Sequence, residues 1–336
     1  MDFKNHPDCR PFTEAGPLSQ MNAWYERGRN VLWVMLHGYP RPCFNPELLQ
    51  DIRTLRAAAK DSGLPIDFWV TGSSAPGIFN VGGDLSYFAR HIRAGETEAL
   101  RTYAHECVDA VYAATVGFDI GAISIAMIEG TAMGGGYEAA LAHEYVLAQK
   151  DVKMGFPEIA FNLYPGMGAY SLVTRKANRG LAEELISSGE AHTAEWYKER
   201  GLVDRVFEQG DAQKAARTLI DEIRPKINGI RAMLRTRRRV LPVDKAELIA
   251  ITEDWAESAF KLEAKDLAYM ERLVMLQNRR AGVAPTPAMS SEAATQVANA
   301  TIAAAALTAS TVSQEAAVEV SEDTTTEAAG QMLFAA

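Results

Sequence analysis

Residues 131–158 read TAMGGGYEAALAHEYVLAQKDVKMGFPE and combine a glycine run with two acidic residues in apolar surroundings. The three glycines follow an apolar segment, and Glu138 comes two positions after the last of them. Glu138 is followed by the small apolar residues AALA. Glu158 follows a proline within the apolar stretch MGFPEIAF. A carboxylate in such a place is costly unless it has a partner, and its pKa tends to rise. The pattern therefore indicates a pair of carboxyl groups suited to general acid–base chemistry.

The glycine run predicts backbone N–H groups that point at a ligand. A strand that ends in glycines and enters a helix leaves unpaired N–H groups at the positive end of the helix dipole. A second glycine loop, FNVGGDL (residues 79–85), follows a strand in the same way, so the two loops could each give one N–H to a single oxygen. A purely structural turn stays open, whereas a phosphate loop is disfavoured because G-x-x-x-x-G-K-[ST] and G-x-G-x-x-G are absent. Asp84 is predicted to cap the helix that begins near Leu85.

Strand-like and helix-like segments alternate along the first half of the chain, which is typical of an α/β protein with a parallel sheet. The chain becomes mostly helical after residue 166, apart from the strand-like LVDRVF at 202–207, and residues 243–280 form the longest helical pattern. The expected strands are 31–37, 66–72, 122–130 and 144–149, and the expected helices are 46–62, a segment from Leu85, 95–116 and the segment GGGYEAALAH at 134–143. We therefore expect an irregular segment 1–25, an α/β core 26–210, a helical region 211–282 and a low-complexity, disordered tail 283–336.

Charge and composition exclude several classes of protein. The chain of 336 residues has a net charge of −9 and is 48% hydrophobic, which disfavours nucleic acid as the main partner. No stretch is long and apolar enough for a membrane span, and the N-terminus has no secretory apolar region. Three scattered cysteines without metal-binding spacing favour a cytoplasmic location and no metal site. The basic cluster 231–239, RAMLRTRRR, is either a solvated helix face or a docking site for an acidic carrier or a phosphate-bearing substrate.

The order FNVGGDL, IEGTAMGGGYE and MGFPEIAFNLYPGMGAY resembles the crotonase (enoyl-CoA hydratase/isomerase) superfamily over roughly residues 28–280. The resemblance implies a crotonase-like spiral of ββα repeats with a C-terminal helical region, and neither a cofactor nor a metal. It implies that an acyl thioester binds with its carbonyl in an oxyanion hole formed by the N–H groups of Gly83 and Gly135. It also implies that Glu138 and Glu158 are the catalytic residues, and it leaves open which glutamate is acid and which is base.

A narrower set of motifs is similar to the synthases of diffusible signal factor, a class of cis-2-enoic fatty acid messengers. The motifs are FNVGGDLSYFARHIRAGE, MGFPEIAFNLYPGMGAYSL, GLVDRV, ITEDWAESA and ERLVMLQNRRAG. They differ from FCAGADL and PGAGGTQRL, which ordinary hydratases usually have. The resemblance implies dehydration of a 3-hydroxyacyl group on acyl carrier protein, followed by hydrolysis of the thioester to the free acid. Trp255, Leu276 and Leu172 are expected to line the acyl pocket, with core packing as the alternative role.

Other functions and partners stay open from the sequence. The main alternative is an enoyl-CoA hydratase or acyl-CoA thioesterase of fatty-acid catabolism, in which CoA replaces acyl carrier protein. A second alternative is a non-catalytic regulatory partner of a sensor kinase, although such a protein would not need both Glu138 and Glu158. The resemblance also implies a homo-oligomer, either a trimer or a hexamer, and a sensor kinase as a regulatory partner.

Overall fold

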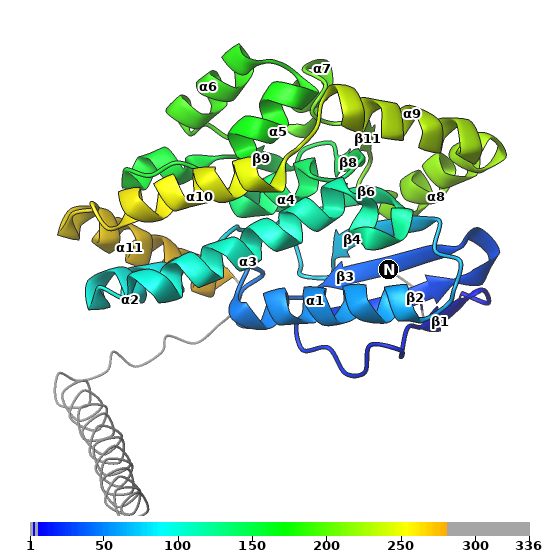
Figure 1. Ribbon diagram of the computed structural model, residues 1–336, viewed down its shortest axis with the longest axis horizontal. Coiled ribbons are helices and arrows are strands. Elements are labelled where there is room, and N and C mark those ends of the chain that lie inside the picture. The colour runs from blue at the N-terminus through cyan, green and yellow to red at the C-terminus, as the bar shows by residue number, and fades with distance from the viewer. Residues whose placement is uncertain (1–2, 4–5, 281–336) are drawn as a thin grey trace, which may run out of the picture. The chain divides into compact units, whose positions relative to one another are not determined.

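A seven-stranded sheet forms the centre of the fold (Figure 1). The computed structural model describes residue 3 and residues 6–280, so the tail expected over 283–336 lies outside the described residues. The strand order is β1-β2-β3-β4-β6-β8-β11; the pairs β1–β2 and β2–β3 are antiparallel, and the other pairs are parallel. The strands are β1 (Cys9–Pro11), β2 (Met21–Glu26), β3 (Val31–Leu36), β4 (Phe68–Ser73), β6 (Ile123–Ile128), β8 (Tyr145–Gln149) and β11 (Arg205–Phe207).

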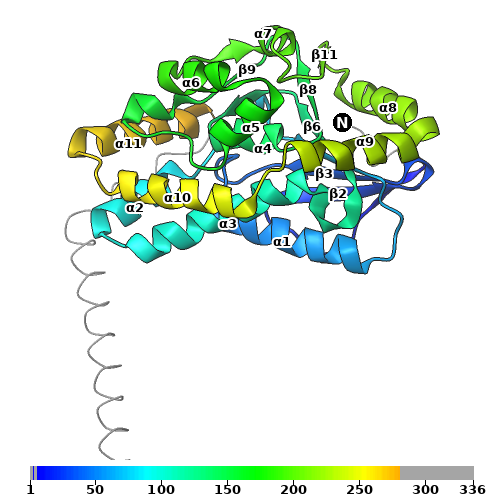
Figure 2. The same ribbon diagram turned by 45° about the horizontal axis from the view of Figure 1, so that its top comes forward.

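Helices cover both faces of this sheet (Figures 1 and 2), which explains why its central strands β3, β4 and β6 are almost completely buried. Alternate residues of β3 face opposite layers: Leu32 packs in the core formed with α1 and α3, and Trp33 in the core formed with α8. The α/β class predicted from the sequence is therefore confirmed. These helices are α1 (Pro46–Asp61), α3 (Thr97–Thr115) and α8 (Ala212–Ile223), and α9 (Ile227–Val240) adds Leu234 to the second core.

A second, smaller sheet of four short strands generates the spiral of ββα repeats. The strands β4, β6 and β8 of the large sheet are each followed by one short strand of the small sheet and then by helix. The order in the small sheet is β10-β9-β7-β5, with only the β9–β10 pair antiparallel. The predicted crotonase-like spiral is thus present. The short strands are β5 (Ile78–Asn80), β7 (Thr131–Met133), β9 (Lys153–Gly155) and β10 (His192–Thr193).

The remaining helices lie around the small sheet. α10 packs along α3, and α11 packs against α2 (Figure 2). No helix of residues 6–280 is long and apolar enough to cross a membrane. The helices are α2 (Leu85–Ala94), α4 (Gly135–Leu141), α5 (Ala169–Lys176), α6 (Arg179–Ser188), α7 (Ala194–Glu199), α10 (Lys245–Ala259) and α11 (Ala264–Arg280), with short helical turns η1 (Arg27–Arg29), η2 (Gly117–Gly121), η3 (Pro157–Phe161) and η4 (Arg224–Lys226).

The prediction of an irregular segment over residues 1–25 was wrong, because this segment supplies two strands. β2 pairs with the whole of β3 in antiparallel register, and β1 pairs with β2. Phe3 is buried and stacks on the ring of Trp24, with ring centroids 4.9 Å apart. The polar residues between these short strands conceal the alternation that would have identified them.

The single helical pattern expected over 243–280 is two helices. α10 ends at Ala259, and α11 begins at Ala264. The carboxylate of Asp266 accepts a hydrogen bond from the backbone N–H of Glu263 at 3.0 Å, which is half of a capping box. This cap starts a new helix where the apolar periodicity alone predicts continuation.

Candidate active site

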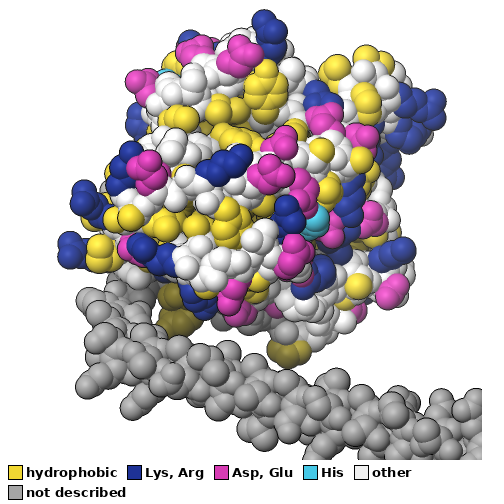
Figure 3. Space-filling view, turned by 60° about the vertical axis from the view of Figure 1, so that its left-hand side comes forward, with side chains coloured by type: hydrophobic (Ala, Val, Ile, Leu, Met, Phe, Trp, Pro, Cys, Tyr) yellow, Lys and Arg dark blue, Asp and Glu magenta, His cyan; other side chains and the backbone are white. Residues whose placement is uncertain are grey.

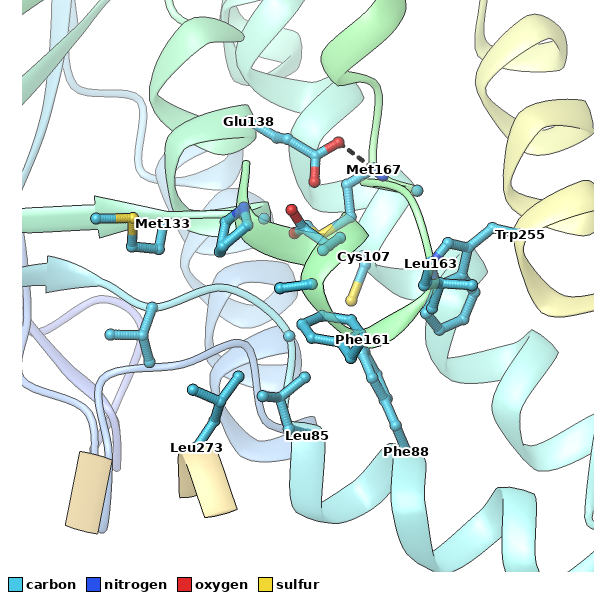
Figure 4. Close-up of a pocket in the computed structure, with 18 of the residues that line it drawn as sticks. Leu85, Phe88, Cys107, Met133, Glu138, Phe161, Leu163, Met167, Trp255 and Leu273 are labelled. Atoms are coloured by element: carbon cyan, nitrogen blue, oxygen red, sulfur yellow. Dashed lines mark hydrogen bonds between the residues drawn. The ribbon is translucent and has the colours of Figure 1, made fainter. Parts of the chain in front are cut away.

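An apolar cavity of about 310 Å³ opens beside the two glycine loops. This volume is in the range of small-ligand sites. Two carboxyl groups, those of Glu138 and Glu158, are the acidic side chains in its lining. Much of the remaining lining comes from apolar side chains of α2, α3, α10, α11, η3 and the segment after η3, namely Leu85, Phe88, Cys107, Phe161, Leu163, Met167, Trp255 and Leu273 (Figure 4).

The loop after β5 fixes the direction of the Gly83 backbone. Asn80 Oδ1 accepts a hydrogen bond from the N–H of Gly82 at 2.8 Å, and the carbonyl of Gly82 accepts one from the N–H of Phe44 at 2.8 Å. Gly83 and Phe44 therefore form an isolated parallel bridge. The carbonyl of Gly82 and the N–H of Gly83 belong to one planar trans peptide and point in opposite directions, so the N–H of Gly83 faces away from Phe44. Asp84 caps α2 as predicted, because its carboxylate accepts from the first-turn N–H groups.

The second loop places Gly135 next to Gly83. Gly135 is the first residue of α4, so its N–H has no acceptor within the helix. A Cβ on Gly135 would lie 3.4 Å from the backbone nitrogen of Gly83, and a Cβ on Gly82 would lie 3.0 Å from that of Gly135. Both predicted donors also line the cavity. Their adjacency is what two donors to one developing oxyanion require.

Glu138 lies in the first turn of α4, completely buried, and its carboxylate is held by main-chain atoms. Oε1 accepts a hydrogen bond from the N–H of Met167 at 2.9 Å (Figure 4) and another from the N–H of Ala169 at 2.8 Å. Burial raises the pKa of the Glu138 carboxyl, and these N–H donors partly offset the rise because they favour the charged form. The same contacts fix the orientation of the carboxyl group.

Glu158 lies in η3, and its carboxyl group fits against the glycine run. A Cβ on Gly134 would lie 2.1 Å from Glu158 Oε1, and Gly134 has a φ of +52°, so both space and backbone conformation require glycine there. Oε2 of Glu158 is buried and has no hydrogen-bond partner among residues 6–280. A buried polar atom of this kind is where a substrate or water would bind.

The two carboxyl groups form an electrostatically coupled pair. Burial raises the pKa of Glu158 well above its usual range, and the negative charge of Glu138 raises it further. With its N–H donors, Glu138 is the member that ionises first as the pH rises. The two carboxyl groups therefore lose their protons in separate steps, which allows one to act as base while the other acts as acid.

The structure places two of the three predicted pocket residues at the cavity. Trp255 of α10 and Leu276 of α11 line it. Leu172 is not in this lining: it is buried on α5 and lines a second cavity, together with Arg175 and Arg238. A role of Leu172 in substrate binding therefore stays a prediction, since helical spacing does not show which face of a short helix meets the cavity.

Several lining residues were not identified from the sequence. Tyr103 and Cys107 lie one turn apart on α3, and Phe88 lies on α2 with its ring against that of Trp255, with centroids 5.0 Å apart. The apolar periodicity of these helices was visible, but it is the same signal that core residues give. The backbone N–H groups that hold Glu138 leave no signal in the side-chain sequence.

The basic cluster 231–239 lies on α9 and contributes nothing to the cavity lining. Arg231 pairs with Asp67 at 2.8 Å, and both Arg237 and Arg238 pair with the buried carboxylate of Glu144. Much of the positive charge of this basic cluster is therefore neutralised by carboxylates beside the sheet, and these ion pairs hold α9 against it. Residues 6–280 also contain no group of three or more His, Cys, Asp or Glu side chains placed to bind a metal.

Comparison with known proteins places this geometry in a family. The model of the family described as "Enoyl-CoA hydratase/isomerase" matches residues 56–273. The chain is 31% identical over 163 residues to 2,3-dehydroadipyl-CoA hydratase of Escherichia coli (strain K12), covering 48% of this chain and 59% of that protein. It is 29% identical over 181 residues to the fatty acid oxidation complex subunit alpha of Pseudomonas syringae pv. tomato, covering 52% of this chain and 23% of that one. The chain thus spans less than two thirds of either relative. The solved structure of Pseudomonas aeruginosa DspI aligns with a TM-score of 0.55 and 25% identity, covering 78% of this chain and 96% of that chain.

Proposed function

Because the chain belongs to the enoyl-CoA hydratase/isomerase family, we propose that it dehydrates a 3-hydroxyacyl thioester on acyl carrier protein and then hydrolyses the thioester. The product would be a free cis-2-enoic fatty acid, a signal of the diffusible-factor type. The observation that carries this proposal is the pair of buried carboxyl groups beside the N–H groups of Gly83 and Gly135, at the wall of an apolar cavity. The narrower sequence motifs support the choice of product.

Dehydration uses one ionised and one protonated carboxyl group. The thioester oxygen accepts hydrogen bonds from the N–H groups of Gly83 and Gly135, which stabilises the enolate that forms when a proton leaves the neighbouring carbon. The ionised carboxylate removes that proton, and the protonated carboxyl gives its proton to the departing 3-hydroxyl, which leaves as water. The pair again holds one proton after this step, so its protonation state is restored.

Hydrolysis can use the same oxyanion site. A water molecule loses a proton to a carboxylate and adds to the carbonyl carbon, and the resulting oxyanion accepts from the same two N–H groups. The C–S bond then breaks, the carrier thiol leaves with a proton, and the free acid remains. The buried, unpartnered Oε2 of Glu158 is a suitable acceptor for this water.

The main alternative is a catabolic enoyl-CoA hydratase or acyl-CoA thioesterase. The name of the E. coli relative, 2,3-dehydroadipyl-CoA hydratase, favours hydration on CoA. Both functions need the same two carboxyl groups and the same oxyanion site, so the carrier and the fate of the thioester distinguish them. A non-catalytic partner of a sensor kinase is the third candidate, and the complete pair of buried glutamates argues against it.

The test is an incubation of the purified protein with 3-hydroxydodecanoyl acyl carrier protein and, separately, with crotonyl-CoA, read by mass spectrometry. We expect release of free 2-enoic acid from the first substrate, and loss of that release in Glu138→Ala and Glu158→Ala. Hydration of crotonyl-CoA with no reaction of the carrier-bound substrate would instead establish the catabolic function. No reaction of either substrate would support the non-catalytic alternative.

The wider setting belongs to the same proposal. We expect a cytoplasmic homo-oligomer, a trimer or a hexamer, that a sensor kinase can bind. Light scattering of the purified protein would give the oligomeric state, and a pull-down with the sensor kinase would test that partner.

A further inference from the structure

The outward face of α11 combines basic and large apolar side chains. Three apolar side chains on it are unusually exposed: Tyr269 at 38%, Met275 at 56% and Leu276 at 46%. Helical spacing puts them on one side of the helix together with Lys265, Arg272 and Arg279. Figure 3 shows the side of the molecule that carries α11, where hydrophobic side chains are exposed among basic ones. Contiguous apolar surface of this kind marks a binding face.

This face begins at the entrance of the acyl cavity. Tyr269 and Leu276 are exposed and also line the cavity, so they form part of its rim. Leu273 and Gln277, on the neighbouring side of α11, line the cavity as well and are less exposed. A molecule bound on the outward face of α11 would therefore lie directly beside the opening through which a thioester enters.

The two arginines of this face are available to a partner. Lys265 pairs with Glu263 at 2.9 Å, whereas neither Arg272 nor Arg279 has a carboxylate within ion-pair distance among residues 6–280. The arginines of α9 differ, because Asp67 and Glu144 neutralise several of them. In a chain with a net charge of −9, exposed and uncompensated arginines beside the cavity favour an acidic partner.

We propose that the outward face of α11 is the docking surface for an acidic carrier protein that delivers the acyl chain as a thioester on a flexible arm. This inference rests on the proposed function and adds where the carrier binds. Arg272 and Arg279 attract the acidic surface, and Tyr269, Met275 and Leu276 supply the apolar contact, a composition typical of protein interfaces. A nucleotide such as CoA would instead need a concave site with converging donors, which an exposed helix face does not provide.

The test compares two charge-reversal variants of the full chain, Arg272→Glu/Arg279→Glu on α11 and Arg235→Glu/Arg239→Glu on α9. Arg235 and Arg239 are also exposed arginines, so the second variant is a matched control at the rival basic surface. Each protein is assayed with the 3-hydroxyacyl group on acyl carrier protein and on N-acetylcysteamine, a small thiol without a protein. We expect the α11 variant to lose roughly 10- to 100-fold in kcat/KM with the carrier protein only, through slower association. The α9 variant should match wild type with both substrates.

Three outcomes would overturn the docking proposal. The first is an unchanged kcat/KM of the α11 variant with the carrier protein, and the second is an equal loss with both substrates, which would mean an effect on the cavity itself. The third is a higher kcat/KM of the α11 variant with the carrier protein, which would mean that the acidic segment 283–336 of this chain occupies the face. Fluorescence anisotropy of labelled carrier protein measures docking without turnover. If wild type converts neither thioester, the proposed function has failed, and the anisotropy measurement still shows whether the carrier protein docks.

Discussion

Replacing Gly134 by alanine should remove most of the dehydration activity while leaving the protein folded. Gly134 has φ +52° and ψ −129°, a conformation that costs a residue with a Cβ about 1–3 kcal/mol. The new Cβ would lie 2.1 Å from Glu158 Oε1, whereas ordinary contacts of a Cβ are 3.4–4 Å. The Glu158 carboxyl must therefore move by more than 1 Å, the difference between those two distances.

The size of the effect follows from that displacement. Misplacing a catalytic group by about 1 Å can reduce a rate roughly 100-fold, so we expect kcat/KM of Gly134→Ala to fall by about that factor. The backbone strain should lower Tm by several degrees, measured by circular dichroism. Mass spectrometry of the 2-enoic product measures the activity.

Gly229→Ala is the matched control, because a Cβ at Gly229, within α9, meets no atom within 4 Å. It should keep full activity and gain about 0.5–1 kcal/mol of stability, as glycine is unfavourable inside a helix. Wild-type kcat/KM in a folded Gly134→Ala variant would refute the reasoning, since the rate would then not depend on where Glu158 places its carboxyl group.

Three further changes test other contacts. Burial raises the folded-state pKa of Glu158 well above the value of 4.5 expected in the unfolded chain. As the pH rises above that value, Glu158 ionises in the unfolded chain before it does in the folded protein, so the free energy of unfolding of wild type falls. The free energy of unfolding of Glu158→Gln, measured in urea, should therefore improve relative to wild type between about pH 5 and 8; a constant difference would contradict this. Arg41→Met removes the 2.6 Å partner of the Asp84 carboxylate and should destabilise the protein by about 3 kcal/mol; an unchanged Tm would show that the pair contributes nothing. In Gly166→Ala, the new Cβ would lie 2.5 Å from Trp255 Cγ, so the indole should move into the cavity and shift kcat/KM toward shorter acyl chains; an unaltered chain-length profile would exclude this.

The sequence identified the parts of the fold that have a strong local signal. The strands β3, β4 and β6 are largely apolar and buried on both faces, and α1 has a cap at Asn45 and a proline at its first position. β5, β7 and β9 were missed, because three residues are too few for a period and their pairing depends on distant segments.

The candidate site was only partly predictable for a similar reason. The glycines and both glutamates were identified because their residue types restrict their chemistry. Leu172 and Trp255, in contrast, are apolar residues on amphipathic helices, and only the packing of α5 and α10 decides which of them reaches the cavity. Sequence periodicity gives the buried side of a helix, but not whether a cavity or a solid core lies there.

The main-chain hydrogen bonds to Glu138 have a consequence for how this protein can evolve. The N–H of Met167 holds the carboxylate, while the side chain of the same residue lines the cavity. Every amino acid except proline retains that N–H. New side chains at position 167 can therefore reshape the cavity for a different acyl group without removing a bond that orients the carboxylate. Under the proposed function, substrate preference and the orientation of the Glu138 carboxylate depend on separate atoms of one residue, and selection can change the first while the second is inherited intact.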